Sequence, residues 1–180
     1  MNTVECIKSR RSVRKFEQRK ISAETIKEIV DIAAFAPSWK NSQTTRYIAV
    51  LDESVKKELA ENCMMNFEYN INNALNAPAL IVVTTVNNRS GYERDGSFTT
   101  SKKTHWQSFD AGIATQTFCL AAYEKGLATV IMGIFDEQKV ADTLSVPEEQ
   151  SVSAIIAIGY GAENPAPPKR KTAEELLTVK

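Results

Sequence analysis

The chain has 180 residues, of which 43% are hydrophobic and 24% are charged, a composition typical of globular proteins that excludes a disordered or fibrous chain. Domains commonly have about 150 residues, so we expect one domain over residues 1–180. Lysine plus arginine and aspartate plus glutamate each number 22, and the formal net charge is zero. Neutralising nucleic-acid phosphates needs a strong basic excess, and we therefore expect no nucleic-acid partner.

The cysteines and the apolar runs indicate the cellular compartment of the protein. Cys6, Cys63 and Cys119 lie far apart and form no C-x-x-C pair, which favours three reduced thiols over a disulfide framework or a zinc site. The chain begins without the apolar stretch of a secretory signal, and the longest apolar run, 77–83, is far shorter than the roughly 20 residues that span a bilayer. We expect a cytoplasmic protein with no bound metal and no membrane partner.

Caps, turn residues and apolar periodicity divide the chain into helices and strands. Ser22 can cap a helix that Pro37 stops, and Ile21 and Ile26 have the spacing of a hydrophobic staple. The expected elements in chain order are a helix near 4–7, a helix between 22 and 37, a strand at 47–51, helices near 55–59 and 67–75, a strand at 79–86, a helix at 104–125, a strand at 128–132, a helix after 136, a strand at 152–158 and a short helix after 172.

The order of these elements predicts the fold class. Residues 79–86 are apolar or β-branched throughout, as in a central strand covered on both faces. Strands and helices do not alternate regularly, which favours an α+β sandwich with helices covering a mixed sheet over a doubly wound fold. Beyond the last strand, a Pro-rich extension at 165–171 ends in three adjacent cations.

The longest predicted helix follows a long polar segment. Residues 87–103 carry two glycines and no periodicity, which is typical of a lid or a mobile loop. The helix at 104–125 has a broad face of large residues and is expected to pack in the core, with Gly126 just past its end. The residues of that face are Trp106, Phe109, Ile113, Thr117, Leu120 and Ala121.

Basic side chains are concentrated at the start of the chain. The first twenty residues hold seven lysines and arginines against two acids. Arginine presents a planar fork of donors that suits phosphate oxygens, and Ser12 within the run adds a hydroxyl donor. The run is either a phosphate-binding site or a solvated basic helix end, and its spacing alone does not decide between the two.

Two further segments could contact a planar ligand. Residues 37–43 are dense in amide and hydroxyl groups, which can match the edge of a heterocycle. Residues 131–133 end a strand at Gly133, where a ligand can approach the backbone closely. Taken alone, each segment is explained better as a polar loop or a plain strand end. No G-x-G-x-x-G or Walker A sequence occurs, so a Rossmann nicotinamide site is unsupported.

Five motifs stand in order along the chain. They are R-R-S-V-R-K-F at 10–16, A-P-S-x-x-N-x-Q at 36–43, D-x-G-x-A-x-Q at 110–116, G-L-A-T at 126–129 with Met132–Gly133, and I-G-Y at 158–160 with the P-x-P-P-K-R tail at 165–170. Together they resemble the flavin-dependent nitroreductase family over nearly the whole chain.

The resemblance implies an α+β sandwich of helices around a mixed, mainly antiparallel sheet. It also implies a homodimer with two FMN sites at the subunit interface and an extended C-terminal arm contacting the partner subunit. The residues implied at the cofactor are Arg10, Arg11, Ser12 and Arg14 with Lys169 and Arg170 at the phosphate and ribityl chain, Pro37, Ser38, Asn41 and Gln43 approaching from the partner subunit, and the backbone of Ile131, Met132 and Gly133 facing the flavin ring near N5.

The implied activity is that of an NAD(P)H oxidoreductase. NADH or NADPH would pass hydride to the flavin, and a small electron-poor acceptor such as a nitroaromatic or a quinone would then take the electrons in the same pocket, with no dedicated catalytic side chain. The family scaffold also hosts specialised reductive chemistry such as dehalogenation. Two alternatives stay open, a flavin-binding sensor or carrier with little turnover and a structural or RNA-associated protein with a basic arm.

One departure from the family pattern follows Gln43. The family usually continues with proline and an aromatic residue, whereas this chain has Thr44-Thr45-Arg46. Because that segment would lie near the pocket, the departure bears on substrate preference more than on cofactor binding. We also expect residues 87–103 to overhang the site and to shape selectivity.

Overall fold

The computed structural model describes residues 2–180 and contains the helices and strands expected from the sequence. They are α1 (Thr3–Ser9), α2 (Ala23–Ala33), the single-turn 3-10 helix η1 (Trp39–Asn41), β1 (Thr45–Val50), α3 (Glu53–Asn62), α4 (Glu68–Asn76), β2 (Ala79–Val86), α5 (His105–Glu124), β3 (Ala128–Met132), α6 (Glu137–Leu144), β4 (Gln150–Gly159) and α7 (Ala173–Leu176). The bounds of β2 and β3 match the prediction, and those of β1, β4 and α5 differ from it by one or two residues. Only η1 was not predicted, because a three-residue helix has no periodic signal.

The four strands form one antiparallel sheet in the order β1-β2-β4-β3. This arrangement confirms the α+β class. Within residues 2–180, the only parallel pairing is an isolated bridge between Ser12 and Thr129 of β3, so the sheet itself is antiparallel and not mixed. Every residue of β2 except Val86 is buried, which confirms a central strand covered on both faces. β1 and β3 are the two edges.

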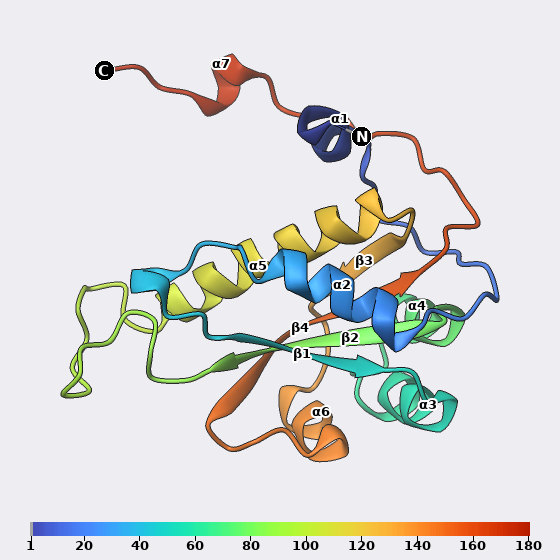
Figure 1. Cartoon of the computed structure of the whole chain (residues 1–180), viewed down its shortest axis with the longest axis horizontal. Helices are drawn as coiled ribbons and strands as arrows, with labels where there is room; N and C mark the ends of the chain where they lie inside the picture. Colours follow the sequence, from blue (N-terminus) through green and yellow to red (C-terminus); the bar gives the residue numbers. More distant parts are fainter. Residues whose placement is uncertain (1) are drawn as a thin grey trace.

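Helices cover both faces of the sheet (Figure 1), with α2 and α5 on one side and α3, α4 and α6 on the other. Successive side chains of a strand point to opposite faces. Accordingly, Leu80 of β2 packs in the cluster that contains Leu59 of α3, whereas Ile81 packs in the cluster that contains Ile29 of α2 and Phe118 of α5. The core is thus two apolar layers separated by the sheet.

Each apolar layer contains a buried free cysteine. Cys63 belongs to the layer with α3 and α4, and Cys119 belongs to the layer with α2 and α5. Burial raises the pKa of both thiols above the ordinary cysteine value. Both therefore remain protonated at neutral pH.

The start of α2 forms as its sequence predicts. Ser22 accepts a hydrogen bond from the backbone N–H of Thr25 at 3.1 Å, which satisfies one of the unpaired donors at the helix N-terminus. Ile21 and Ile26 are both buried in the same apolar layer, as a hydrophobic staple requires.

The prediction for α5 was right about its length and wrong about its buried face. Small residues such as Ala111, Ala114 and Ala122 lie against the sheet together with Phe118. They let the helix approach closely, and its larger apolar side chains remain on the outer side. Of the predicted core face only Ala121 is buried, whereas Phe109 is 56% exposed and the rest are half-buried. In one chain, α5 therefore has an apolar outer face without a cover.

The C-terminal segment leaves the two helical layers after β4. Its first residues follow the basic run, since Glu163 Oε1 accepts from the backbone N–H of Arg14 at 2.7 Å and Ala162 N–H donates to the Lys15 carbonyl at 2.9 Å. The segment then runs outward to α7, which stands apart from the sheet in Figure 1. Its apolar side chains Leu176, Leu177 and Val179 are exposed. None of the helices in residues 2–180 has the length and apolar character to cross a membrane.

The end of β4 offers a test of core packing. A Cβ added at Gly159 would lie 2.5 Å from Cδ of Pro78 and 2.8 Å from Cδ1 of Phe16. We expect Gly159→Ala to lower the free energy of unfolding by about 1–3 kcal/mol, because an overpacked core must shift. The control is Gly161→Ala, whose Cβ comes no closer than 3.2 Å to another atom, and its loss should be smaller. Equal losses in urea unfolding would contradict this packing argument.

Candidate functional site

The basic run lies along the edge strand β3. Residues 10–16 are extended after α1, and the backbone N–H of Val13 donates to the Thr129 carbonyl at 3.1 Å beside the Ser12–Thr129 bridge. A strand rises about 3.3 Å per residue, so Met132 at the end of β3 is about 10 Å from this bridge. The structure thus brings the basic run and the end of β3 to the same edge of the sheet.

The arginines of the run are not neutralised by acids. Within the described chain, Arg10, Arg11 and Arg14 form no ion pair, and the Nε atoms of Arg10 and Arg11 are buried without a hydrogen-bond partner. Unpaired buried donors are costly, so these atoms indicate a place for an anionic ligand such as a phosphate. Arg11 is partly engaged elsewhere, because it donates to the carbonyls of Lys8 and Arg10 at the end of α1, at 2.6 and 2.9 Å. Arg11 thus contacts the end of α1, whereas the phosphate-binding interpretation of the run stays a prediction.

The turn after β3 leaves its backbone open. Ile131 is half-exposed, Met132 is buried, and a Cβ built on Gly133 would meet no atom within 4 Å. Asn70 of α4 donates through Nδ2 to the Ile134 carbonyl at 3.0 Å and so holds the segment that follows. Asn70 was not among the residues predicted from the sequence. The feature of the sequence that could have indicated a role for Asn70 is its place on the core-facing side of α4, where apolar residues are usual.

Residues 37–43 lie at the opposite edge of the sheet, directly before β1. The backbone N–H of Trp39 donates to Asp110 Oδ2 of α5 at 2.9 Å, and the N–H of Gln43 donates to Ser38 Oγ at 2.9 Å. Asp110 is buried, so its carboxylate needs such donors. Asp110 was recognised as part of a motif, but no role was predicted for it. The signal that could have indicated one is an acid on the buried face of a helix.

The backbone of this segment is strained. Lys40, Asn41 and Gln43 have φ values of 45°, 54° and 48°. This left-handed conformation costs residues with a Cβ roughly 1–2 kcal/mol each. Strain of this kind concentrates at binding sites, where surrounding contacts hold it in place.

Within one chain, the two groups of predicted cofactor residues do not meet. Two strands separate β1 from β3 in the sheet. Along α5, the thiol of Cys6 from α1 donates to the Leu120 carbonyl at 3.5 Å, whereas Trp39 binds Asp110. Ten residues of helix span about 15 Å. The basic run and the end of β3 are therefore neighbours, and residues 37–43 lie apart from both.

The 87–103 segment is fastened to residues 37–43. Ser90 Oγ donates to Asp110 and lies 3.0 Å from Ser42 Oγ, and the ammonium of Lys40 lies 3.0 Å from Glu93 Oε1. No helix or strand occurs in the segment apart from the Tyr92–Phe98 bridge, as predicted for a loop.

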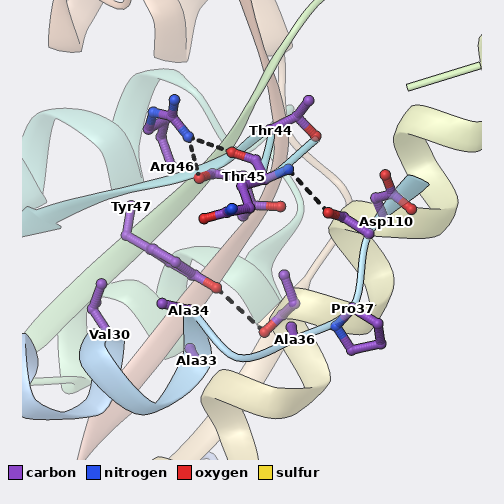
Figure 2. Close-up of a pocket in the computed structure, with 13 residues that line it drawn as sticks. Val30, Ala33, Ala34, Ala36, Pro37, Thr44, Thr45, Arg46, Tyr47 and Asp110 are labelled. Atoms are coloured by element: carbon purple, nitrogen blue, oxygen red, sulfur yellow. Dashed lines mark hydrogen bonds between the residues drawn. The ribbon is translucent and has the colours of Figure 1, made fainter. Parts of the chain in front are cut away.

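A cavity of about 360 Å³ opens between α2, β1 and α5 (Figure 2). Pro37, Ser38 and Gln43 line it together with Thr45 and Tyr47, so the departure from the family pattern lies in its wall. The hydroxyl of Tyr47 donates to the Ala114 carbonyl at 3.3 Å. Burial raises the pKa of Tyr47 to about 12, so this hydroxyl stays protonated at neutral pH.

Lys169 and Arg170 are exposed on the C-terminal segment, which starts beside the basic run and then leaves it. The structure therefore brings together Arg10, Arg11, Ser12, Arg14, Ile131, Met132 and Gly133 at one edge of the sheet. It holds Pro37, Ser38, Asn41 and Gln43 at the other edge, and Lys169 and Arg170 on the tail.

These features define an α+β protein with unpaired arginine side chains at the edge of its sheet. The model of the nitroreductase family matches residues 7–160, and the chain belongs to this family. The expected resemblance is thus confirmed.

Individual relatives agree with this assignment. A protein of Archaeoglobus fulgidus, provisionally named an NADH dehydrogenase/NAD(P)H nitroreductase, is 30% identical over 164 residues that cover 87% of this chain and 85% of that one. A nitroreductase family protein from Clostridium novyi NT is 30% identical, with a TM-score of 0.78 over 91% of this chain and 87% of that one. A provisionally named nitroreductase from Exiguobacterium sibiricum, solved in complex with FMN, shares the fold at 20% identity, with a TM-score of 0.86 over 100% and 98% of the two chains.

Gly91 and Gly96 form a matched pair for testing how the 87–103 segment is held. Their φ values are +85° and +84°, so alanine strains both backbones alike. A Cβ at Gly91 would lie 2.6 Å from the Lys103 carbonyl and 3.0 Å from Cδ1 of Trp106, whereas Gly96 has open space. We expect trypsin to cut the segment faster in Gly91→Ala than in Gly96→Ala, by about fivefold for each ~1 kcal/mol of easier opening. Equal cleavage rates would contradict the packing of the segment on Trp106.

Proposed function

We propose that the protein is an FMN-dependent NAD(P)H oxidoreductase that reduces nitroaromatics, quinones or similar electron-poor acceptors. The observation that carries this proposal is the pair of buried, unpartnered guanidinium nitrogens of Arg10 and Arg11, which lie at the same edge of the sheet as the open turn after β3, in a chain of the nitroreductase family. The NAD(P)H in the name of the Archaeoglobus relative and the FMN in the Exiguobacterium structure support the choice of donor and cofactor.

The residues at the edge of the sheet fit FMN. Arg10 and Arg14 would bind the phosphate through charge-assisted hydrogen bonds, with Arg11 and Ser12 toward the ribityl chain. When bound, FMN supplies a ring position, N5, that accepts hydride from NAD(P)H and passes the electrons on to the acceptor. The backbone at 131–133 would face the ring there, because Gly133 leaves room for close approach. Lys169 and Arg170 would close over the phosphate.

A second copy of the chain would complete each site. Pro37, Ser38, Asn41 and Gln43 would come from the partner subunit, since in their own chain they lie at the wrong edge of the sheet. The uncovered apolar face of α5 supports a homodimer, because exposed apolar patches commonly mark interfaces. The C-terminal arm, with its exposed apolar side chains, would contact the partner subunit.

The 87–103 segment would shape acceptor selectivity in this dimer. It is tied through Ser90 and Glu93 to the segment that would approach the flavin of the partner subunit. Any change in how the loop packs would therefore alter the entrance to that flavin.

A visible absorption spectrum tests the proposal. The purified protein is incubated with FMN, freed of excess cofactor and treated anaerobically with NADPH or NADH. We expect a flavin band that bleaches with one of the donors and returns when a nitroaromatic or a quinone is added. A flavin band that persists would instead identify a sensor or carrier with little turnover, and the lack of any band would contradict FMN binding.

The phosphate assignment can be tested separately. We expect Arg10→Ala and Arg14→Ala each to cost about 1.5–3 kcal/mol of FMN affinity, which is a weakening of roughly tenfold or more, because each removes a charge-assisted contact. Fluorescence titration of the apoprotein with FMN measures this loss. The matched control is Lys27→Ala, which removes an exposed cation of α2. If the doubly substituted protein keeps FMN as tightly as the control, these arginines do not hold the phosphate.

A further inference from the structure

We propose that the end of the 87–103 segment binds the adenosine 2′-phosphate of NADPH, with Lys102 and Lys103 at the phosphate and Phe98 against the adenine. NADPH differs from NADH only by this phosphate, so the site would make NADPH the preferred donor. The inference rests on the proposed function and deepens it by naming the donor and the residues that select it.

The loop that joins β2 to α5 is basic in a protein of zero net charge. Residues 87–103 hold four lysines and arginines against two acids. Two of the cations, Lys102 and Lys103, are adjacent and exposed, and they form no ion pair within the described chain. Lysine binds phosphate groups as a point charge. Their charge is therefore available to an anionic ligand.

Both acids of the loop are already engaged. Glu93 Oε1 accepts from the ammonium of Lys40 at 3.0 Å. Asp95 Oδ1 accepts from the backbone N–H of Ser97 at 3.0 Å and from its hydroxyl at 2.6 Å. In dinucleotide-binding proteins, a carboxylate that accepts from the ribose 2′-hydroxyl selects NADH, whereas a cation at that position accommodates the 2′-phosphate of NADPH. Unpaired cations beside engaged acids match NADPH.

An exposed aromatic ring lies beside the lysines. Phe98 is 44% exposed, and the ammonium of Lys103 lies 5.8 Å from the centroid of its ring. Tyr92 packs on Phe98 with the ring centroids 4.8 Å apart, which holds the ring in place. Aromatic side chains stack on nucleic-acid bases such as adenine. A base stacked on the open part of Phe98 would bring its ribose beside Lys103.

The backbone around the lysines is fixed without a ligand. The N–H of Lys103 donates to the Thr100 carbonyl at 3.1 Å, and Nε1 of Trp106 donates to Thr100 Oγ1 at 2.8 Å. Lys103 has a φ of 48°, a left-handed conformation that is unfavourable for a residue with a Cβ. Such strain is concentrated at binding sites. A site that is ordered in advance binds its ligand at a smaller cost in conformational entropy.

The attachment of the loop relates this site to the proposed flavin pocket. Ser90 Oγ lies 3.0 Å from Ser42 Oγ, and Glu93 binds Lys40. Ser42 and Lys40 belong to the segment that would approach the flavin of the partner subunit. The nicotinamide of NADPH would therefore reach that flavin while its adenosine end stays on the loop.

Calorimetric titration of the full-length protein with adenosine phosphates tests the site directly. We expect 2′,5′-ADP to bind about threefold to twentyfold more tightly than 5′-ADP, which has the same number of phosphates and none on the 2′ oxygen. Higher salt should reduce this difference, because exposed ion pairs are screened. Equal affinities at low salt, or no binding of 2′,5′-ADP, would overturn the proposal. Neither ligand carries a nicotinamide, so this result does not depend on whether the protein binds or reduces FMN.

Matched variants separate the phosphate contact from the base contact. The double variant Lys102→Gln/Lys103→Gln should weaken binding of 2′,5′-ADP about threefold to twentyfold and leave that of 5′-ADP unchanged. The control is Lys27→Gln, which removes an exposed cation of α2 and should leave both affinities unchanged. Phe98→Leu should weaken both ligands by the same factor, because it removes the stacking surface. If the double variant binds 2′,5′-ADP as tightly as the control, the lysines do not hold the phosphate.

Steady-state kinetics of the FMN-loaded protein tests the choice of donor. The double lysine variant should lower the ratio of kcat/KM for NADPH to kcat/KM for NADH by the factor found with 2′,5′-ADP, and the change should lie in KM for NADPH. Lys27→Gln should leave the ratio as it is in the parent protein. An equal loss of kcat/KM with both donors would mean that the lysines act on the loop as a whole, and it would overturn the assignment.

Discussion

The buried carboxylate of Asp110 is the contact on which the rest of the candidate site depends. It accepts hydrogen bonds from the backbone of Trp39 and from the hydroxyl of Ser90, and so joins α5, the segment before β1 and the 87–103 loop. A carboxylate removed from water must find such donors, which makes the junction specific as well as stable. Asp110 lines both the cavity beside Tyr47 and a second cavity bounded by Trp106 and Phe109. Their shapes are therefore coupled through one residue.

The packing of α5 connects the core to the site. Alanines bring the helix close to the sheet, and the volume that they leave is filled by Phe118. The large apolar side chains that have no room there turn outward, and they form the surface at which we propose that a second copy of the chain binds. The packing of the core and the proposed dimer interface thus depend on the same residues of α5.

Much of the fold could be predicted from local signals. β2 is apolar along its length and α2 has a cap, a staple and a clear apolar face, so each was found correctly. The rotation of α5 could not be predicted, because the helix is apolar around most of its circumference and no polar side fixes its orientation. The pairing of residue 12 with residue 129 is equally invisible in the sequence, since contacts between distant segments leave no periodic pattern. For the site, the residue types were readable from motifs, whereas the contact of Asn70 with the Ile134 carbonyl and the strained turn at Lys40 became evident only in three dimensions.

Two of the three buried cysteines can report on motions of the core. Cys63 and Cys119 lie in different apolar layers, one on each side of the sheet, and burial keeps both as unreactive thiols. A thiol-labelling reagent can reach either of them only when the layer around it opens. The labelling rates of Cys63 and Cys119 therefore report separately how often the apolar layer on each side of the sheet opens. A difference between the two rates shows that the two layers open independently.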